Sequence, residues 1–175
     1  KTGISRFDGH RFIPLEENER INELGGWVFD LHEDREGLMW FAAHSGAGYF
    51  DPRDGKTRFI SGITSSVDTH IEQDSKGTIW LTSAEIMYRY FKDSGTLVSY
   101  PANKYFSVVS SCSDDNGTMW FACNDGQLRR FDDNEENFVT IPLQDNISHE
   151  IGERPYRVQA ISGSQILVVT TFNRI

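Results

Sequence analysis

Apolar side chains in this chain form short runs at adjacent positions instead of alternating with polar ones. The three clearest runs are Met39-Trp40-Phe41, Ile79-Trp80-Leu81 and Met119-Trp120-Phe121. Neighbouring side chains of a β-strand point to opposite faces, so a strand of this kind is covered on both sides. Turn residues bound each run after about six residues, which is too short for a helix. The pattern therefore predicts strands in sheets that are packed on both faces.

The runs recur with a period of forty residues. Each Trp is preceded by an Asp six residues earlier and by a Gly three residues earlier: Asp34, Gly37 and Trp40; Asp74, Gly77 and Trp80; Asp114, Gly117 and Trp120. Asp-x-x-Gly is a tight-turn signature, because Asp accepts a backbone hydrogen bond and Gly supplies a positive φ. Repeats of this length indicate solenoids, propellers or arrays.

Each repeat has the pattern of four antiparallel strands. β-branched and aromatic residues flank each Asp-x-x-Gly turn, which predicts a hairpin. Third strands are expected at residues 47–51, 86–91 and 127–132, and fourth strands near residues 57–61, 96–100 and 137–141. Four strands per forty residues, covered on both faces, are typical of a β-propeller blade. A helical repeat would need two amphipathic helices per unit, and the sequence has no such pattern.

The sequence thus predicts an all-β fold, a β-propeller fragment of three complete four-stranded blades and two half-blades. The complete blades are expected at residues 27–61, 67–100 and 106–141. Residues 1–13 match the third and fourth strands of a preceding blade, and residues 156–175 match the start of a following blade. In that last hairpin Leu167 takes the place of the Trp.

A propeller fragment of this kind exposes strand edges and bare sheet faces, which closed rings hide. We therefore expect the segment to self-associate or to occur within a larger chain. Residues 3–13 and 156–171 are complementary half-blades, which could combine within one chain or between two.

Composition narrows the classes of partner. The chain has 17 Lys and Arg against 26 Asp and Glu, for a net charge of −9, and no basic stripe follows the repeats. This argues against nucleic acid as a partner. No apolar stretch approaches the roughly 18 residues of a membrane span. In this segment, contact with the membrane is therefore expected only through other parts of a longer parent chain.

Cysteine and histidine patterns point to no cofactor and no metal. Cys112 is expected opposite about Met119, which places Cys123 on the order of 13 Å away along the strand and too far for a disulfide. Two free, largely buried thiols are predicted. The five His residues show no His-x-x-x-His spacing, and Cys-x-x-Cys is absent.

Catalytic motifs are also missing, so no catalytic residue is predicted. Ser45 lacks a Gly-x-Ser-x-Gly frame, and the stretch Gly46-Ala47-Gly48 has no following helix to bind a phosphate. Both are interpreted as a sharp turn. The three repeated Trp residues are interpreted as core, because a residue needed in every blade packs blade against blade.

Function is then expected in the loops, where the repeats differ. Loops that join the second strand to the third, and the fourth strand to the next blade, open on one face of a propeller. The candidate ligand-binding residues on that face are His44, His70, Tyr105, Asn124 and Asp125. Aromatic, amide and carboxylate groups are what hydroxyl-rich ligands require, although ordinary surface loops have the same composition.

The repeat resembles a known family. Asp-x-x-Gly-x-(Ile/Met)-Trp-(Phe/Leu)-(Ala/Thr), followed by Gly-x-x-x-x-Phe-Asp, is similar to the two-component regulator propeller repeat over residues 27–141. That family forms the periplasmic sensor region of hybrid two-component histidine kinases of Bacteroides type. Glu85-Ile86-Met87 departs from the family pattern, which often has Gly there.

The resemblance implies a seven-bladed propeller, a periplasmic location and a non-catalytic sensor role. Such receptors detect oligosaccharides released from glycans and control transcription of the matching utilisation genes, and their kinase modules lie outside this segment. Two alternatives remain open. Streptogramin lyases are propellers with similar Gly-x-Ile-Trp-Phe strands, and a WD-repeat-like scaffold could bind another protein through one face.

Overall fold

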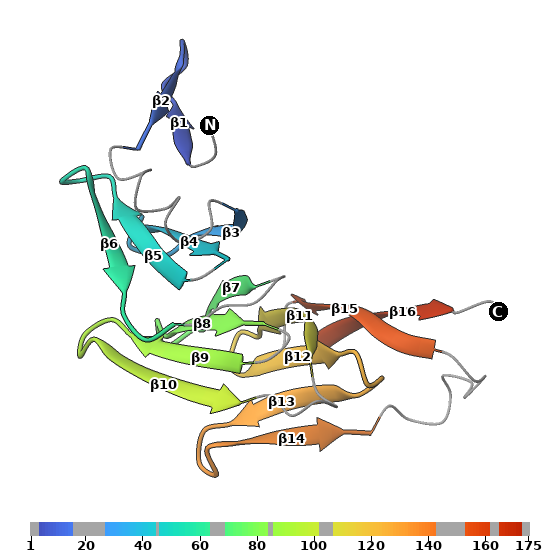
Figure 1. The fold of residues 1–175 in the computed structure, drawn as a ribbon. Helices are drawn as coiled ribbons and strands as arrows, with labels where there is room; N and C mark the ends of the chain where they lie inside the picture. The colour runs from blue at the N-terminus through green and yellow to red at the C-terminus, as the bar shows by residue number, and fades with distance from the viewer. Residues whose placement is uncertain are drawn as a thin grey trace. The chain divides into compact units, whose positions relative to one another are not determined.

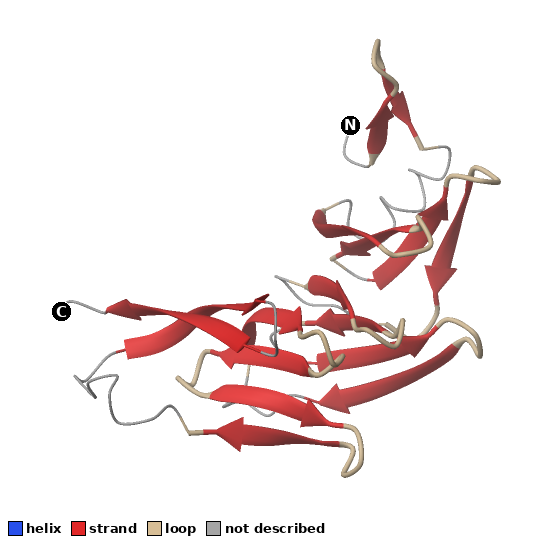
Figure 2. Ribbon diagram, turned by 180° about the vertical axis from the view of Figure 1, so that it is seen from behind, coloured by secondary structure: helices blue, strands red, loops and turns tan. Residues whose placement is uncertain are grey.

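The computed structural model describes residues 4–15, 27–44, 46–63, 69–83, 86–101, 107–142, 153–161 and 165–172. These residues form sixteen strands in five antiparallel sheets and no helix (Figures 1 and 2). The all-β prediction is confirmed. The chain divides into two compact units, residues 1–71 and 72–175.

Three of the sheets have four strands each, in the order of the chain. The first contains β3 (Val28–Glu33), β4 (Met39–Ala43), β5 (Gly46–Asp51) and β6 (Lys56–Ile60). The second contains β7 (His70–Gln73), β8 (Ile79–Thr82), β9 (Ile86–Phe91) and β10 (Thr96–Pro101). The third contains β11 (Val108–Ser113), β12 (Met119–Cys123), β13 (Leu128–Asp132) and β14 (Asn137–Ile141). The boundary between the two units falls inside β7.

The other two sheets are two-stranded hairpins. One consists of β1 (Ser5–Phe7) and β2 (Phe12–Pro14), in the first unit. The second consists of β15 (Glu153–Ile161) and β16 (Gln165–Phe172), in the second unit. β15 begins earlier than the Tyr156 expected from the sequence, because Glu153, Arg154 and Pro155 also pair with β16.

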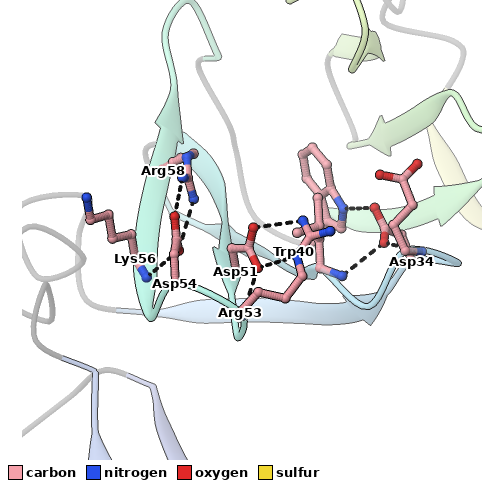
Figure 3. A network of polar contacts seen from close by, with 9 residues as sticks. Asp34, Trp40, Asp51, Arg53, Asp54, Lys56 and Arg58 are labelled. Carbon is pink, nitrogen blue, oxygen red and sulfur yellow. Dashed lines mark hydrogen bonds and ion pairs between the residues drawn. The ribbon is translucent and has the colours of Figure 1, made fainter.

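A buried Asp organises the start of each four-stranded sheet. The indole Nε1 of Trp40 donates to Asp34 Oδ2 at 2.9 Å (Figure 3), and Asp34 Oδ1 accepts the backbone N–H groups of Glu36 and Leu38. The same bonds recur between Trp80 and Asp74 at 3.0 Å and between Trp120 and Asp114 at 3.0 Å. All three Asp residues are buried. One carboxylate therefore closes the turn and also fixes the tryptophan of the next strand.

A second turn in the first sheet is also built on carboxylates. Hydrogen bonds from the Arg53 side chain hold the pKa of Asp51 at about 2, and Arg58 pairs with Asp54 at 2.5 Å across the β5–β6 turn (Figure 3). Arg53 is mostly exposed, and Arg58 and Asp54 are partly exposed, while Asp51 is buried. Because each ion pair has at least one partner in contact with solvent, these pairs shape the turn and add little to stability.

Every four-stranded sheet has two different faces. The tryptophan face carries the Trp of the second strand, and the phenylalanine face carries the residue that follows it, which is Phe41, Leu81 or Phe121. In the second unit, the tryptophan face of β7–β10 carries Trp80, whose ring lies 5.7 Å from the ring of Phe121 and 5.0 Å from that of Phe131. Those two rings belong to the phenylalanine face of β11–β14. A buried Arg89 side chain stacks on Trp80 and Phe131 and pairs with Asp133 of the adjoining sheet at 2.8 Å.

The β15–β16 hairpin packs on the other face of the β11–β14 sheet. Four of its apolar side chains cover the tryptophan face of β11–β14, which carries Cys112, Ala122, Leu128 and the half-buried Trp120. The four are Val158, Ala160, Ile166 and Val168. In the second unit, the tryptophan face of β7–β10 therefore packs against the phenylalanine face of β11–β14, and the tryptophan face of β11–β14 packs against the β15–β16 hairpin.

Both cysteines are free and buried, as predicted. The expected register was wrong by one residue, because Cys112 lies opposite Trp120 and not Met119. The turn closes with a hydrogen bond from Asp114 N–H to the Thr118 carbonyl, so the strand pair starts at Ser113 and Met119. Burial raises the pKa of each thiol from 9.0 to about 12.

We expect Asp74→Asn to lower the free energy of unfolding by about 1–3 kcal/mol, because an amide cannot accept the Trp80 indole N–H and also accept both backbone N–H groups. Trp80→Ala should cost roughly 3–5 kcal/mol, as large core deletions do. Urea unfolding measures both. The matched control is Asp93→Asn, at an exposed turn position. A cost for Asp74→Asn no larger than that of the control would show that the anchor is dispensable.

The thiols should be protected from Ellman's reagent at mildly alkaline pH while the chain is folded, and both should react in urea. The folded state holds each proton more tightly than the unfolded chain. This contribution to stability is therefore complete below pH 9.0 and is lost as the pH rises toward about 12. An exposed control thiol, Ser99→Cys, should react at once in the folded chain. Equally fast reaction of the native thiols would contradict the burial of Cys112 and Cys123.

Candidate functional site

The loops between second and third strands lie at one end of each sheet, together with the start of the first strand. In the first unit this end carries His44, which follows β4. The backbone N–H of His44 donates to the carbonyl of Trp27 at 3.0 Å, and its exposed ring lies 6.3 Å from the ring of Phe29. The Trp27 side chain is 68% exposed. An imidazole and a large exposed indole thus belong to the same end of the sheet.

Asn124 occupies the same repeat position in the second unit. Its backbone N–H donates to the Ser107 carbonyl at 2.9 Å, as His44 does to Trp27. In addition, Asn124 Oδ1 accepts the backbone N–H of Ser107 at 3.1 Å. The side chain is exposed, and its oxygen fixes the entry to β11.

Asp125 is held in a two-bond ion pair with Arg129. The guanidinium donates to Oδ1 at 2.9 Å and to Oδ2 at 2.5 Å, and the backbone N–H of Gln127 donates to Oδ1 at 3.1 Å. Burial alone raises the pKa of Asp125, but the bonds from Arg129 and Gln127 outweigh it and leave the pKa below its ordinary value. Asp125 is therefore an ionised acceptor that already has a partner.

His70 is exposed at the start of β7. The same repeat position holds Asp30 in the first sheet and Ser110 in the third. Asp30 Oδ2 accepts the backbone N–H of Ile71 at 2.8 Å, and Ser110 Oγ accepts that of Val158 at 3.3 Å. In two of the three repeats, the side chain at this position therefore accepts a hydrogen bond from the first strand of the following sheet. Tyr105 lies outside the described residues, and the assignment of all five candidates to a ligand stays a prediction.

Two groups at this end were not among the sequence-based candidates. Trp27 could have been found because it is the fourth tryptophan and stands out of phase with the three repeated ones. Arg129 could not have been found from the sequence. Its side chain bonds Asp125 only because the β12–β13 turn brings the two residues together.

In the described ranges, no group of three or more His, Cys, Asp or Glu side chains is arranged to hold a metal ion. The same ranges include no helix that is long and apolar enough to cross a membrane.

Solved structures share this architecture. The extracellular domain of BT4673 from B. thetaiotaomicron is described as a putative one component system in one structure, which matches 97% of this chain with a TM-score of 0.73 at 15% identity. It is described as a putative hybrid two component system in another, which matches 95% of the chain with a TM-score of 0.71 at 14% identity. The WD40 beta propeller domain of Doa1 matches 82% of the chain with a TM-score of 0.62 at 15% identity. The chain has a β-propeller fold. It spans 24% of the BT4673 structure and 47% of the Doa1 structure.

An enzyme is also among the structures with this fold. Inactive virginiamycin B lyase from Staphylococcus aureus matches 81% of the chain, and 48% of its own length is covered, with a TM-score of 0.61 at 17% identity. No protein-family model and no curated protein sequence matches the chain. At these identities the likeness establishes the fold, and the resemblance drawn from the repeat to sensor propellers has a counterpart among the solved structures.

Proposed function

We propose that this segment is part of the non-catalytic ligand-recognition propeller of a hybrid two-component receptor. The extracellular domain of BT4673 supports this, since its match extends over 97% of the chain with a TM-score of 0.73, against 81% and 0.61 for the lyase. The segment would lie in the periplasm, as the outer part of an inner-membrane receptor whose histidine kinase modules lie elsewhere in the parent chain.

The proposed ligand is an oligosaccharide derived from a glycan, and the proposed output is transcription of the genes that use it. The observation that carries this proposal is the pairing of exposed Trp27 with His44 at the variable end of the first sheet. A sugar ring presents both an apolar face and a rim of hydroxyl groups. An indole supplies a flat apolar surface with one polar N–H, and an imidazole supplies a donor and an acceptor.

The second unit offers complementary chemistry at the equivalent end. The Asn124 amide nitrogen is a donor, and the Asp125 carboxylate and Arg129 guanidinium form a fixed pair of acceptors and donors. Binding sites for small ligands combine apolar surface with a few fixed polar groups of this kind. In each unit, the groups at this end are therefore of the kind that a hydroxyl-rich ligand requires.

Isothermal titration calorimetry of the intact receptor against a panel of glycan-derived oligosaccharides tests the proposal. We expect Trp27→Ala with His44→Ala to weaken binding at least about tenfold, or about 1.4 kcal/mol, with unchanged far-UV circular dichroism. His10→Ala removes an exposed imidazole from the β1–β2 turn and should leave affinity unchanged. Alanine at His70, Tyr105, Asn124 and Asp125 should weaken binding further.

Two results would overturn different parts of the proposal. Unchanged affinity in the Trp27 and His44 variants would show that this end of the sheets is not the binding face. Binding of no oligosaccharide by the wild-type receptor would show that the ligand class is wrong, whatever the variants do.

A further inference from the structure

Two buried hydroxyl groups in the second unit lack a hydrogen-bond partner. Within the described part of the chain, three buried side-chain N or O atoms are unpaired, namely Thr82 Oγ1, Ser111 Oγ and Arg89 Nε. The Arg89 guanidinium is bonded to Asp133 through another of its nitrogens. The two hydroxyl groups have no such compensation. Because a buried hydroxyl without a partner costs free energy, the pair calls for a physical explanation.

Thr82 and Ser111 lie on the two surfaces that face each other in this unit. Thr82 follows Trp80 by two residues in β8, so its side chain is on the tryptophan face of β7–β10. Ser111 lies opposite Phe121 in the β11–β12 register, so its side chain is on the phenylalanine face of β11–β14. The rings of Trp80 and Phe121 are 5.7 Å apart across this interface. Thr82 is fully buried and Ser111 is only 8% exposed, so both hydroxyl groups are enclosed in the interface.

The repeat indicates that these two side chains meet. Thr82 takes the place of Ala122, because both follow the tryptophan of their strand by two residues. Ser111 takes the place of Val158, because each lies opposite the residue that follows the tryptophan position. Ala122 and Val158 belong to one buried cluster at the next interface. Thr82 and Ser111 are therefore the corresponding pair between the second and third sheets.

Polar residues at this pair of positions are specific to one interface. The position of Thr82 holds Ala in the first and third sheets, and the position of Ser111 holds Leu31, Ile71 and Val158 in the other copies. The two hydroxyl residues thus occur together, on the two sides of the same interface. One of them alone would bring an unpaired group into an apolar contact, whereas two that face each other can share a partner. The pairing indicates that the two hydroxyl groups act as a unit.

We propose that Thr82 Oγ1 and Ser111 Oγ hold one ordered water molecule between them, inside the interface of the second and third sheets. The two hydroxyl groups do not bond each other directly. Each can donate one hydrogen bond and accept others, as a water molecule can. Buried waters in proteins are held in this way, by two to four polar groups that have no other partner. Ser111 is also smaller than Leu31, Ile71 and Val158, which favours space for a water beside it.

The water bridge would give β11 a polar link to the preceding sheet. Its link to the following hairpin is direct, since Ser110 Oγ accepts the backbone N–H of Val158 at 3.3 Å. The link through water would join β11 to β8 instead, within an interface whose core includes Met87, Val108 and Cys123. It would satisfy both hydroxyl groups without separating these apolar side chains.

A high-resolution crystal structure of the intact protein tests the site directly. We expect density for one water at ordinary hydrogen-bond distances, about 2.7–2.8 Å, from both hydroxyl oxygens. Thr82→Val keeps the shape of the side chain and should remove the water. Thr140→Val, which removes an exposed hydroxyl group from β14, should leave the water in place. A direct hydrogen bond between Thr82 and Ser111, or no density between their oxygens in the wild-type protein, would overturn the proposal.

Urea unfolding of the intact protein tests whether the two hydroxyl groups act together. Thr82→Val and Ser111→Ala each leave the other hydroxyl group with an incompletely bonded water, so each should move the midpoint to lower urea concentration. The double variant removes both polar groups and should shift the midpoint by less than the two single shifts combined. Thr140→Val and Ser99→Ala, both at exposed positions, should give shifts that add. Additive shifts at Thr82 and Ser111 would contradict a shared water.

Discussion

The whole structure depends on a carboxylate that is bonded three times. In each four-stranded sheet, one buried Asp accepts two backbone N–H groups of its own turn and the indole N–H of the tryptophan six residues later. A buried carboxylate is tolerated only when its lone pairs are satisfied, and these donors satisfy them. The carboxylate that closes the turn therefore also holds the tryptophan, and movement of the tryptophan removes the indole donor from Oδ2.

This anchor determines how the sheets pack. With the indole ring fixed on one face, the next side chain along the strand points to the other face, as with Trp80 and Leu81. Each sheet then presents a tryptophan face and a phenylalanine face, and in the second unit one meets the other around the Trp80 cluster. The buried Arg89 belongs to the same interface, where its stacked guanidinium and its bond to Asp133 keep the charge paired.

The fold was largely predictable from the sequence, because the residue patterns that determine each sheet lie close together in the chain and occur three times. The turn signature, the adjacent apolar positions and the forty-residue period all act within one sheet. The one-residue error at Cys112 arose because the hydrogen bond that closes the turn is not visible in residue types. The Asp-to-Trp hydrogen bond was missed for the same reason, although the constant spacing of six residues contained the signal.

The candidate site was less predictable, since its groups depend on contacts between segments. Asn124 is drawn back toward Ser107, and Asp125 is engaged by Arg129, and neither contact follows from composition. Trp27 was not among the candidate residues, because the repeat pattern assigns tryptophan to the core. The residues that distinguish one copy from another at this end are those that depart from the repeat.

The link from Asp30 to Ile71, and from Ser110 to Val158, has a consequence for how such a chain can change over time. In both cases one side chain bonds a backbone N–H of the following first strand. A backbone N–H is present in every residue except proline, so the receiving strand needs no particular side chain. A duplicated unit therefore carries its own connector and can be joined to almost any neighbour. Copying and exchange of units is compatible with the fold, while the loops are free to diverge.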